Sequence, residues 1–249
     1  MSAGSALTLE AISRSFGGVA ALTDVNLSVP IGSRTAIIGP NGAGKTTLFN
    51  IVSGALTPTS GSVCLFQHDV TKLTMPRRAA LGLARTYQIN NLFPALPLRE
   101  NLFLAVQALS RAKFSLLRPA SSYRSVWQRV DGLLHSWGLE TRGHLPVKDL
   151  SYGEQRQVEI LMAIGSNPRL LLLDEPTAGL SPGETEQVTS LLTNLPAEVT
   201  VLFVEHDMDV AFEVATHMMV LNHGEVVAEG TPDAMRRHPK VQEVYLGAE

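Results

Sequence analysis

Cysteine is nearly absent from this 249-residue sequence, since Cys64 is its only copy. The chain therefore has no internal disulfide bond, as is typical of proteins from a reducing compartment, and a sizeable hydrophobic core is expected instead. Cys64 itself lies in the apolar stretch of residues 62–66, which predicts a buried structural thiol.

Long apolar runs and an excess of basic residues are missing as well. No run of about 18 apolar residues occurs, so no segment is expected to span a bilayer. Residues 1–9 lack the basic run followed by an apolar stretch that marks a secretory signal. The formal net charge is −3, which gives no indication of nucleic-acid binding through a basic surface. If the protein acts at a membrane, another chain must supply the spanning segments.

What the sequence does contain is a phosphate-binding loop at residues 39–47, Gly-Pro-Asn-Gly-Ala-Gly-Lys-Thr-Thr. Its glycines leave backbone N–H groups open to a triphosphate and permit unusual backbone angles. A strand is predicted at residues 33–38 and a helix from about Lys45, so the positive end of the helix would face the phosphates. Lys45 would reach the outer phosphates, and the Thr46 hydroxyl would hold Mg²⁺. The predicted nucleotide-binding residues of this loop are Gly39, Pro40, Asn41, Gly42, Ala43, Gly44, Lys45, Thr46 and Thr47.

A second chemical signal follows four consecutive leucines at residues 170–173. An unbroken apolar run of this length is typical of a strand buried on both faces of a parallel sheet. Asp174 comes next, at the strand end where open α/β sheets bind ligands, and is predicted to hold Mg²⁺ through water. Glu175 would point to the other side and deprotonate the water that attacks a γ-phosphate. Taken alone, these residues also fit a strand followed by an acidic turn.

The segment that begins at Ser151 allows two interpretations. Ser151 and Glu154 have the spacing of a capping box, and an apolar helical pattern follows them. A well-capped helix accounts for this pattern and is favoured by the spacing alone. The alternative is a second anion site, in which Ser151, Gly153 and the positive end of the helix bind a γ-phosphate.

Three isolated residues are ambiguous in the same way. His206 follows a predicted strand at residues 200–204, and it is either an ordinary histidine or one that touches the γ-phosphate or the attacking water. Gln88 ends a strand-like run from Leu83 and could reach Mg²⁺ or water. Phe16 stands beside two glycines, where it either packs normally or offers a platform to an adenine ring.

The order of the predicted elements indicates an α/β fold. It is a P-loop NTPase core with a mostly parallel sheet, an N-terminal antiparallel β lobe and an inserted α-helical lobe. The β lobe is predicted from alternating residues at 7–12 and 25–29, and helical periodicity dominates residues 98–138. Because no Pro/Gly/Ser-rich linker flanks the helical lobe, approximately residues 90–165, we expect one domain of residues 1–249.

Taken together, these elements resemble the ATP-binding subunit of ABC transporters over nearly the whole chain. The matching motifs are the Walker A loop at residues 39–46, the Q-loop at Gln88, the signature motif at residues 151–155, Walker B at residues 170–175, the D-loop at residues 178–181 and the switch histidine His206. Six motifs in this order are far more specific than any one of them. The resemblance implies catalytic roles for Glu175, His206 and Gln88, nucleotide contacts from Phe16, Ser151, Gly153 and Glu154, and Mg²⁺ ligands in Thr46, Gln88 and Asp174.

Two positions depart from the common family pattern. Tyr152 stands in the signature motif where glycine is usual, and Ser181 ends the D-loop where aspartate is usual. Both features resemble the subgroup that serves branched-chain amino acid importers, as do the insertion at residues 114–124 and the stretches at residues 204–208 and 244–247. Relatives that import urea or other amides, or export lipopolysaccharide, share many of these features.

The resemblance implies an ATPase that powers membrane transport, with ATP and Mg²⁺ as its cofactors. Two ATPase subunits, identical or related, would face head to tail and close on ATP. Transmembrane permease subunits and, indirectly, a substrate-binding protein would complete the machine at the cytoplasmic face of the inner membrane. Two other hypotheses fit less well. The first is a ribosome-associated or DNA-repair ATPase of the same superfamily, but this sequence has neither the second cassette of the former nor the long coiled coil or zinc motif of the latter. The second is a nucleotide sensor without turnover, which would not need Glu175 and His206.

Overall fold

A computed structural model describes residues 4–86, 92–108 and 119–246 of the protein. The strands are β1 (Ser5–Phe16), β2 (Val19–Pro30), β3 (Arg34–Ile38), β4 (Ser60–Leu65), β5 (His68–Asp69), β6 (Leu83–Arg85), β7 (Leu170–Asp174), β8 (Thr200–Val204), β9 (His217–Asn222) and β10 (Glu225–Gly230). The helices are α1 (Lys45–Ser53), α2 (Met75–Ala80), α3 (Leu98–Ala108), α4 (Arg124–Ser136), α5 (Tyr152–Gly165), α6 (Pro182–Thr193), α7 (Met208–Val214), α8 (Pro232–Arg236) and α9 (Pro239–Leu246). Short 3₁₀ turns occur at Ala120–Ser122, Glu140–Arg142 and Val147–Asp149.

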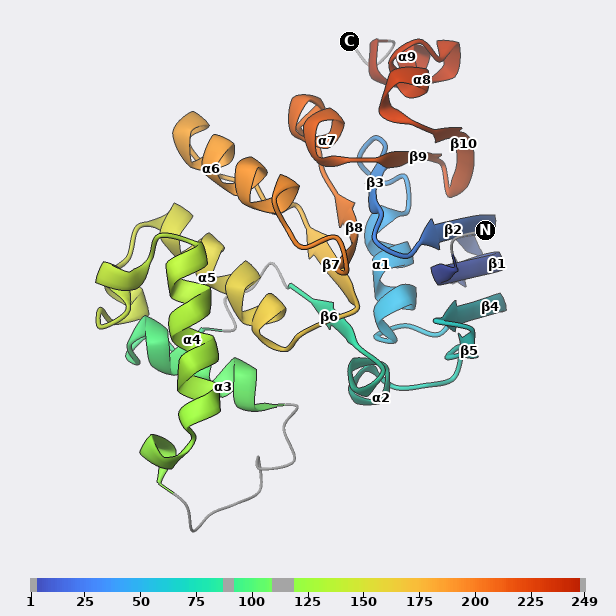
Figure 1. The fold of residues 1–249 in the computed structure, drawn as a ribbon. Coiled ribbons are helices and arrows are strands. Elements are labelled where there is room, and N and C mark those ends of the chain that lie inside the picture. Colours follow the sequence, from blue (N-terminus) through green and yellow to red (C-terminus); the bar gives the residue numbers. More distant parts are fainter. Residues whose placement is uncertain (1–3, 87–91, 109–118, 247–249) are drawn as a thin grey trace.

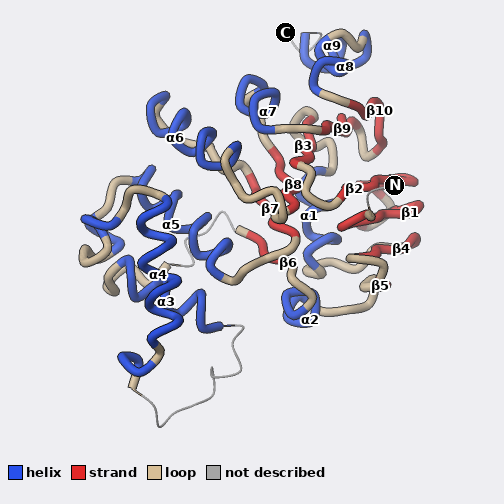
Figure 2. The backbone as a smooth tube through the Cα atoms, viewed as in Figure 1, coloured by secondary structure: helices blue, strands red, loops and turns tan. Residues whose placement is uncertain are grey.

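The strands form two sheets that lie on either side of α1 (Figures 1 and 2). One sheet is antiparallel, in the order β2-β1-β4-β5. The other follows the order β10-β9-β3-β8-β7-β6, in which all neighbours are parallel except β10 and β9. Helices α3, α4 and α5 follow β6 and precede β7 in the chain, and they form a group to one side of both sheets (Figure 1).

Apolar side chains alternate between the two faces of the six-stranded sheet and bury both. Leu170 and Leu172 of β7 pack toward α1 and the antiparallel sheet, while Leu171 and Leu173 pack toward α6 and α7. A third apolar cluster joins α3, α4 and α5 and includes Leu102, Val130 and Leu161. Burial on both faces explains why β7 and β8 are continuous apolar runs in the sequence.

The predicted fold class is confirmed, with a mostly parallel sheet, an N-terminal antiparallel sheet and a helical group between β6 and β7. Several local predictions were too short or wrong. Strands β1 and β2 are each longer than expected, because Gly17 and Gly18 both take positive φ and close a tight hairpin between them. Strand β5 was missed. Cys64 is only partly buried, because its neighbours Val63 and Leu65 face the core and successive side chains of a strand lie on opposite faces. In the part of the chain that the structure describes, every helix is too short or too polar to cross a membrane.

A buried arginine closes the C-terminal end of α1. Arg78 of α2 is 1% exposed, and its guanidinium donates hydrogen bonds to the carbonyl oxygens of Ile51 and Val52, both at 2.7 Å. It also donates to the carbonyl oxygens of Leu73 and Thr71. Burial lowers the pKa of Arg78 to about 10, which leaves it a cation at neutral pH. The last carbonyls of the helix that follows the phosphate loop therefore have charged donors.

Candidate active site

The phosphate loop leaves β3 and leads into α1, as the sequence predicts. Gly39 and Gly44 have φ values of 152° and 105°, and a Cβ atom at either would meet a backbone carbonyl oxygen, of Leu221 and Ala21 respectively. Only glycine fits both positions without moving the backbone. Gly42 has positive φ and open space around it, so the middle of the loop keeps its backbone accessible.

Lys45 begins α1 and folds back over the loop. Its Nζ donates hydrogen bonds to the carbonyl oxygens of Gly39, at 2.6 Å, and Pro40, at 2.9 Å, and the residue is 6% exposed. Burial lowers the pKa of Lys45, while the carboxylates of Glu175 and Asp174 act in the opposite direction. The ammonium group thus lies in the field of both acidic residues, while Thr46 beside it is exposed.

Parallel pairing brings the ends of three strands to one edge of the sheet. Val204 of β8 lies in register with Ile37 of β3 on one side and with Asp174 of β7 on the other. The phosphate loop follows β3, Glu175 follows β7 and His206 follows β8, so the residues predicted separately meet at this edge. Ligands of open α/β sheets bind at this place.

Glu175 and His206 form a hydrogen-bonded pair. Glu175 leaves the strand at once, with φ of 48°, and its backbone N–H donates to the carbonyl oxygen of Val204. Its side chain accepts a 2.6 Å hydrogen bond from Nε2 of His206. The side chains are 24% and 44% exposed, so both reach water. A carboxylate that is oriented by an imidazole and accessible to water is suited to accept a proton as a general base.

Asp174 is 5% exposed and is bound by an arginine that the sequence analysis did not identify. Arg85 of β6 donates from Nη2 to Oδ2 of Asp174 at 3.2 Å. Its Nη1 donates to Asn50 and Ser53 of α1, at 2.7 and 3.0 Å. The only signal in the sequence was a charged residue within an otherwise apolar strand-like run.

Arg156 and Glu205 fix the turns that follow β7 and β8, and both were also missed. Arg156 of α5 donates to the carbonyl oxygens of Asp174 and Glu175, both at 2.7 Å, and its Nε donates to that of Pro176. Glu205 is 2% exposed and accepts hydrogen bonds from Thr177 and from the backbone N–H of His206. Apart from the bond between Glu205 and His206, these contacts join different elements of the chain, so spacing alone could not have found them.

Ser151 and Glu154 form the predicted capping box at the start of α5. The backbone N–H of Ser151 donates to Glu154 at 2.8 Å, and that of Glu154 donates to the Ser151 hydroxyl at 3.2 Å. Glu184 of α6 lies directly against Gly153, where an added Cβ atom would meet its carboxylate. Hydrogen bonds from the backbone and hydroxyl of Ser181, and weaker ones from Gly153 and Ser151, lower the pKa of Glu184. A carboxylate thus lies against the helix end that was predicted to bind an anion.

The remaining predicted residues are less tied to the site. Phe16 ends β1 and is 47% exposed, with the guanidinium of Arg14 over its ring at 4.7 Å. An exposed ring leaves open both interpretations, packing and base stacking. Gln88 lies outside the residues that the structure describes.

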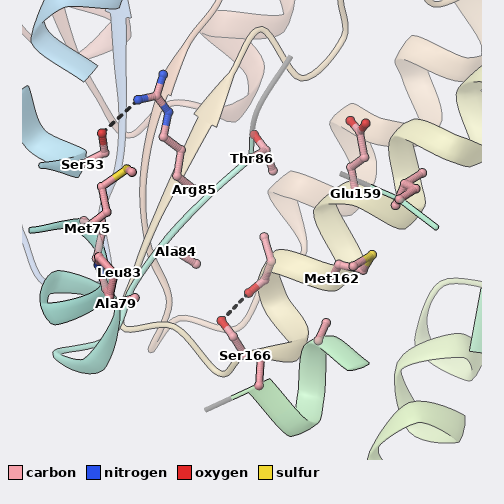
Figure 3. Close-up of a pocket in the computed structure, with 15 residues that line it drawn as sticks. Ser53, Met75, Ala79, Leu83, Ala84, Arg85, Thr86, Glu159, Met162 and Ser166 are labelled. Carbon is pink, nitrogen blue, oxygen red and sulfur yellow. Dashed lines mark hydrogen bonds between the residues drawn. The ribbon is translucent and has the colours of Figure 1, made fainter. Parts of the chain in front are cut away.

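A separate pocket of 430 Å³ lies beside β6 (Figure 3), and none of its lining residues belongs to the phosphate loop. Its wall comes from α2, α3 and α5 and is mostly apolar, with Met75, Ala108 and Met162 among its residues. Ser53 and Arg85 also line it, and the dashed line between these two residues in Figure 3 marks their hydrogen bond. Arg85 therefore lines the pocket and binds Asp174 at the same time.

Comparison with known proteins gives the family. A family model described as ABC transporter matches residues 22–178, and one described as branched-chain amino acid ATP-binding cassette transporter matches residues 225–249. The chain belongs to the ABC transporter family of ATP-binding cassettes, as the six motifs predicted, and is an ATPase.

Individual relatives are similar over almost their whole length. The high-affinity branched-chain amino acid transport ATP-binding protein BraF of Pseudomonas aeruginosa is 36% identical, with 97% of each chain covered. The ADP conformation of MJ1267, an ATP-binding cassette of an ABC transporter, has a TM-score of 0.85 and 28% identity, with 98% of this chain and 99% of that one covered. The dimeric post-hydrolysis state of the cassette MJ0796, bound to ADP and Pi, has a TM-score of 0.77 and 28% identity, with 91% and 98% covered.

The contact between Gly153 and Glu184 leads to a testable prediction. In Gly153→Ala the new methyl group meets the end of a flexible side chain, and alanine favours a helix by about 0.5–1 kcal/mol over glycine. We expect the stability to be unchanged or slightly higher, while ATP-dependent dimerisation weakens by about tenfold or more because the methyl covers the helix end. Urea unfolding and sedimentation velocity with ATP measure the two effects. Loss of stability with intact dimerisation would contradict the assignment.

Proposed function

We propose that ATP binds along the edge of the sheet where β3, β7 and β8 end. The register of Ile37, Val204 and Asp174 is the observation that carries this proposal, because it aligns the phosphate loop with the acidic residues. Backbone N–H groups of the loop bind the phosphates, and the ammonium of Lys45 leaves its loop carbonyls to bind the outer ones. Phe16 stacks on the adenine ring.

Mg²⁺ is held by the hydroxyl of Thr46 and the carboxylate of Asp174, together with the phosphates and Gln88. Oxygen donors of this kind fit the ion, which is bound in proteins by one or two carboxylates plus substrate phosphates. When bound, the ion neutralises charge that develops on the phosphates. The exposure of Thr46 and the position of Asp174 at the end of β7 support these roles.

Glu175 acts as the general base and His206 holds it in place. The imidazole binds Oε1 of Glu175, which directs the carboxylate and leaves its other oxygen to accept a proton from water. Arg156 binds the backbone carbonyl oxygen of Glu175, which keeps the backbone of the base in place when its side chain gains or loses a proton. Attack of this water on the γ-phosphate releases ADP and phosphate.

Replacing the base tests this mechanism. Glu175→Gln keeps the shape but cannot take the proton, so ATP should bind normally while hydrolysis slows by roughly 10²–10⁴-fold. Nucleotide binding and steady-state phosphate release measure the two steps. Glu213→Gln, an exposed residue of α7, makes the same charge change away from the site and should leave both unchanged. Near-normal turnover in Glu175→Gln would reject Glu175 as the base.

The working unit is a pair of ATPase subunits, either two copies or this chain with a related one. Each ATP lies between the phosphate loop of one subunit and Ser151, Gly153 and Glu154 of the other. The dimeric structure of the related cassette MJ0796 supports this arrangement. The positive end of α5, against which the carboxylate of Glu184 already lies, supports an anion site for the γ-phosphate at this place.

Permease subunits dock at the apolar pocket beside β6, which places the ATPase peripherally on the cytoplasmic face of the inner membrane. The pocket lies between the helical group and the sheet, so movement of one against the other changes its shape. An apolar hollow on the surface is suited to a protein partner.

Charge placed in this pocket tests the docking site. Ala108→Glu puts a carboxylate on the apolar wall and should reduce co-purification with the permeases by about tenfold or more, since burying it unpaired is costly. Leu104→Glu is the matched control, because Leu104 lies on the same helix, is exposed and does not line the pocket. Equal loss of binding in both variants would place the contact elsewhere on α3.

The transported substrates are branched-chain amino acids, delivered by a substrate-binding protein. The name of the relative BraF and the family match at residues 225–249 support this choice. Uptake of labelled leucine, compared with urea, by vesicles that contain this subunit and its permeases tests it. Urea uptake without leucine uptake would favour the amide-importer alternative, and lipopolysaccharide release would favour the exporter.

A further inference from the structure

We propose that Arg85 is a positioning residue that directs Asp174 and lowers its affinity for Mg²⁺. The inference rests on the proposed role of Asp174 as a ligand of that ion. It assigns a function to a side chain that belongs to none of the six family motifs.

The guanidinium of Arg85 hydrogen-bonds two elements of the site, α1 and β7. Nη2 binds Oδ2 of Asp174 at 3.2 Å, and Nη1 binds Asn50 and Ser53 at 2.7 and 3.0 Å. The side chains of Arg85 and Asp174 are 7% and 6% exposed, so water screens the pair weakly. The aromatic ring of Phe49 lies 5.8 Å from the guanidinium carbon. The contacts with α1 therefore hold the planar guanidinium of Arg85 in one orientation. The guanidinium in turn orients the carboxylate of Asp174.

The backbone reinforces this alignment. Strands β6 and β7 are paired in parallel, with Arg85 in register with Leu172. The N–H of Thr86 donates to the carbonyl oxygen of Leu172, and the N–H of Asp174 donates to the Thr86 hydroxyl at 3.4 Å. Arg85 and Asp174 are thus fixed to each other through both backbone and side chains.

Two consequences follow for a divalent cation at Asp174. Because Oδ2 is bound by Arg85, Oδ1 is the oxygen assigned to the ion, which fixes the direction from which Asp174 acts. The positive charge of Arg85 also offsets the negative charge that attracts the ion, in addition to the effect of Lys45 on the same carboxylate. Orientation favours turnover, while charge compensation weakens binding of the ion.

The position of Arg85 also connects this ligand to the pocket beside β6. Arg85, Ser53 and Thr86 line that pocket, as Figure 3 shows for all three. A partner seated there touches the same residues that hold Asp174. A partner that displaces the guanidinium of Arg85 would therefore change both the orientation of the Asp174 carboxylate and the positive charge beside it.

The test compares Arg85→Gln and Arg85→Lys with the parent subunit. In Arg85→Gln the carboxylate loses its nearby cation, so the Mg²⁺ concentration that half-saturates tight binding of a fluorescent ATP analogue should fall by about fivefold or more. The value of kcat should fall by about tenfold because the carboxylate is no longer directed. Arg85→Lys keeps the charge without the fork, so its Mg²⁺ dependence should stay within about twofold of the parent while kcat falls.

Arg78→Lys is the matched control, because Arg78 is also buried and also binds α1 but contacts its carbonyls rather than Asp174. It should lower stability and leave the Mg²⁺ dependence unchanged. If Arg85→Gln does not fold, the double variant Asn50→Ala/Ser53→Ala loosens the fork instead and should lower kcat with the Mg²⁺ affinity retained. Weaker Mg²⁺ binding in Arg85→Gln, or an unchanged kcat, would overturn the inference.

Asp174→Asn separates this inference from the proposed function. If Mg²⁺ dependence is unchanged in Asp174→Asn, then Asp174 is not a ligand and the proposed site itself fails. If Asp174→Asn weakens Mg²⁺ binding while Arg85→Gln leaves it at the parent value, only the role of Arg85 is rejected.

Discussion

The parallel register of β3, β8 and β7 is the constraint on which the proposed active site depends. It places Ile37, Val204 and Asp174 side by side, and thereby brings the segment after β3 to the same edge as the segments after β7 and β8, although more than a hundred residues separate β3 from either strand. The apolar runs that make these strands are buried on both faces, so the register is fixed by packing as well as by hydrogen bonds. Asp174, Glu175 and His206 lie at or just after the ends of these strands, so the register of the strands also sets their relative positions.

Buried arginines carry much of the alignment beyond the strands. Arg156 binds the carbonyls after β7, Arg78 binds the end of α1, and Arg85 joins α1 to Asp174. Each guanidinium binds several acceptors at once, which suits a planar group with five donors. Charged hydrogen bonds thus join α1, which follows the phosphate loop, to β7, which ends in the acidic residues. The apolar core holds the same two elements together.

The segments that carry the two departures from the family pattern lie against each other. Tyr152 of the signature motif packs on Gly179 of the D-loop, where an added Cβ atom would be 3.3 Å from the tyrosine ring. Ser181, which replaces the usual aspartate, donates to Glu184, and Glu184 lies on Gly153. The signature motif and the D-loop therefore form one packed unit, in which a serine in place of an aspartate avoids a second negative charge beside Glu184.

The sequence by itself determined the fold class, the phosphate loop, the buried strands and the capping box at Ser151, because each depends on local spacing and on apolar periodicity. It also indicated Asp174, Glu175 and His206, because each follows a recognisable strand. Only the tertiary structure decided that Glu175 and His206 touch, that Arg85 binds Asp174 and that Glu184 lies on Gly153. These are contacts between elements whose separation along the chain carries no periodic signal, and they arise from how the helices pack against the sheet.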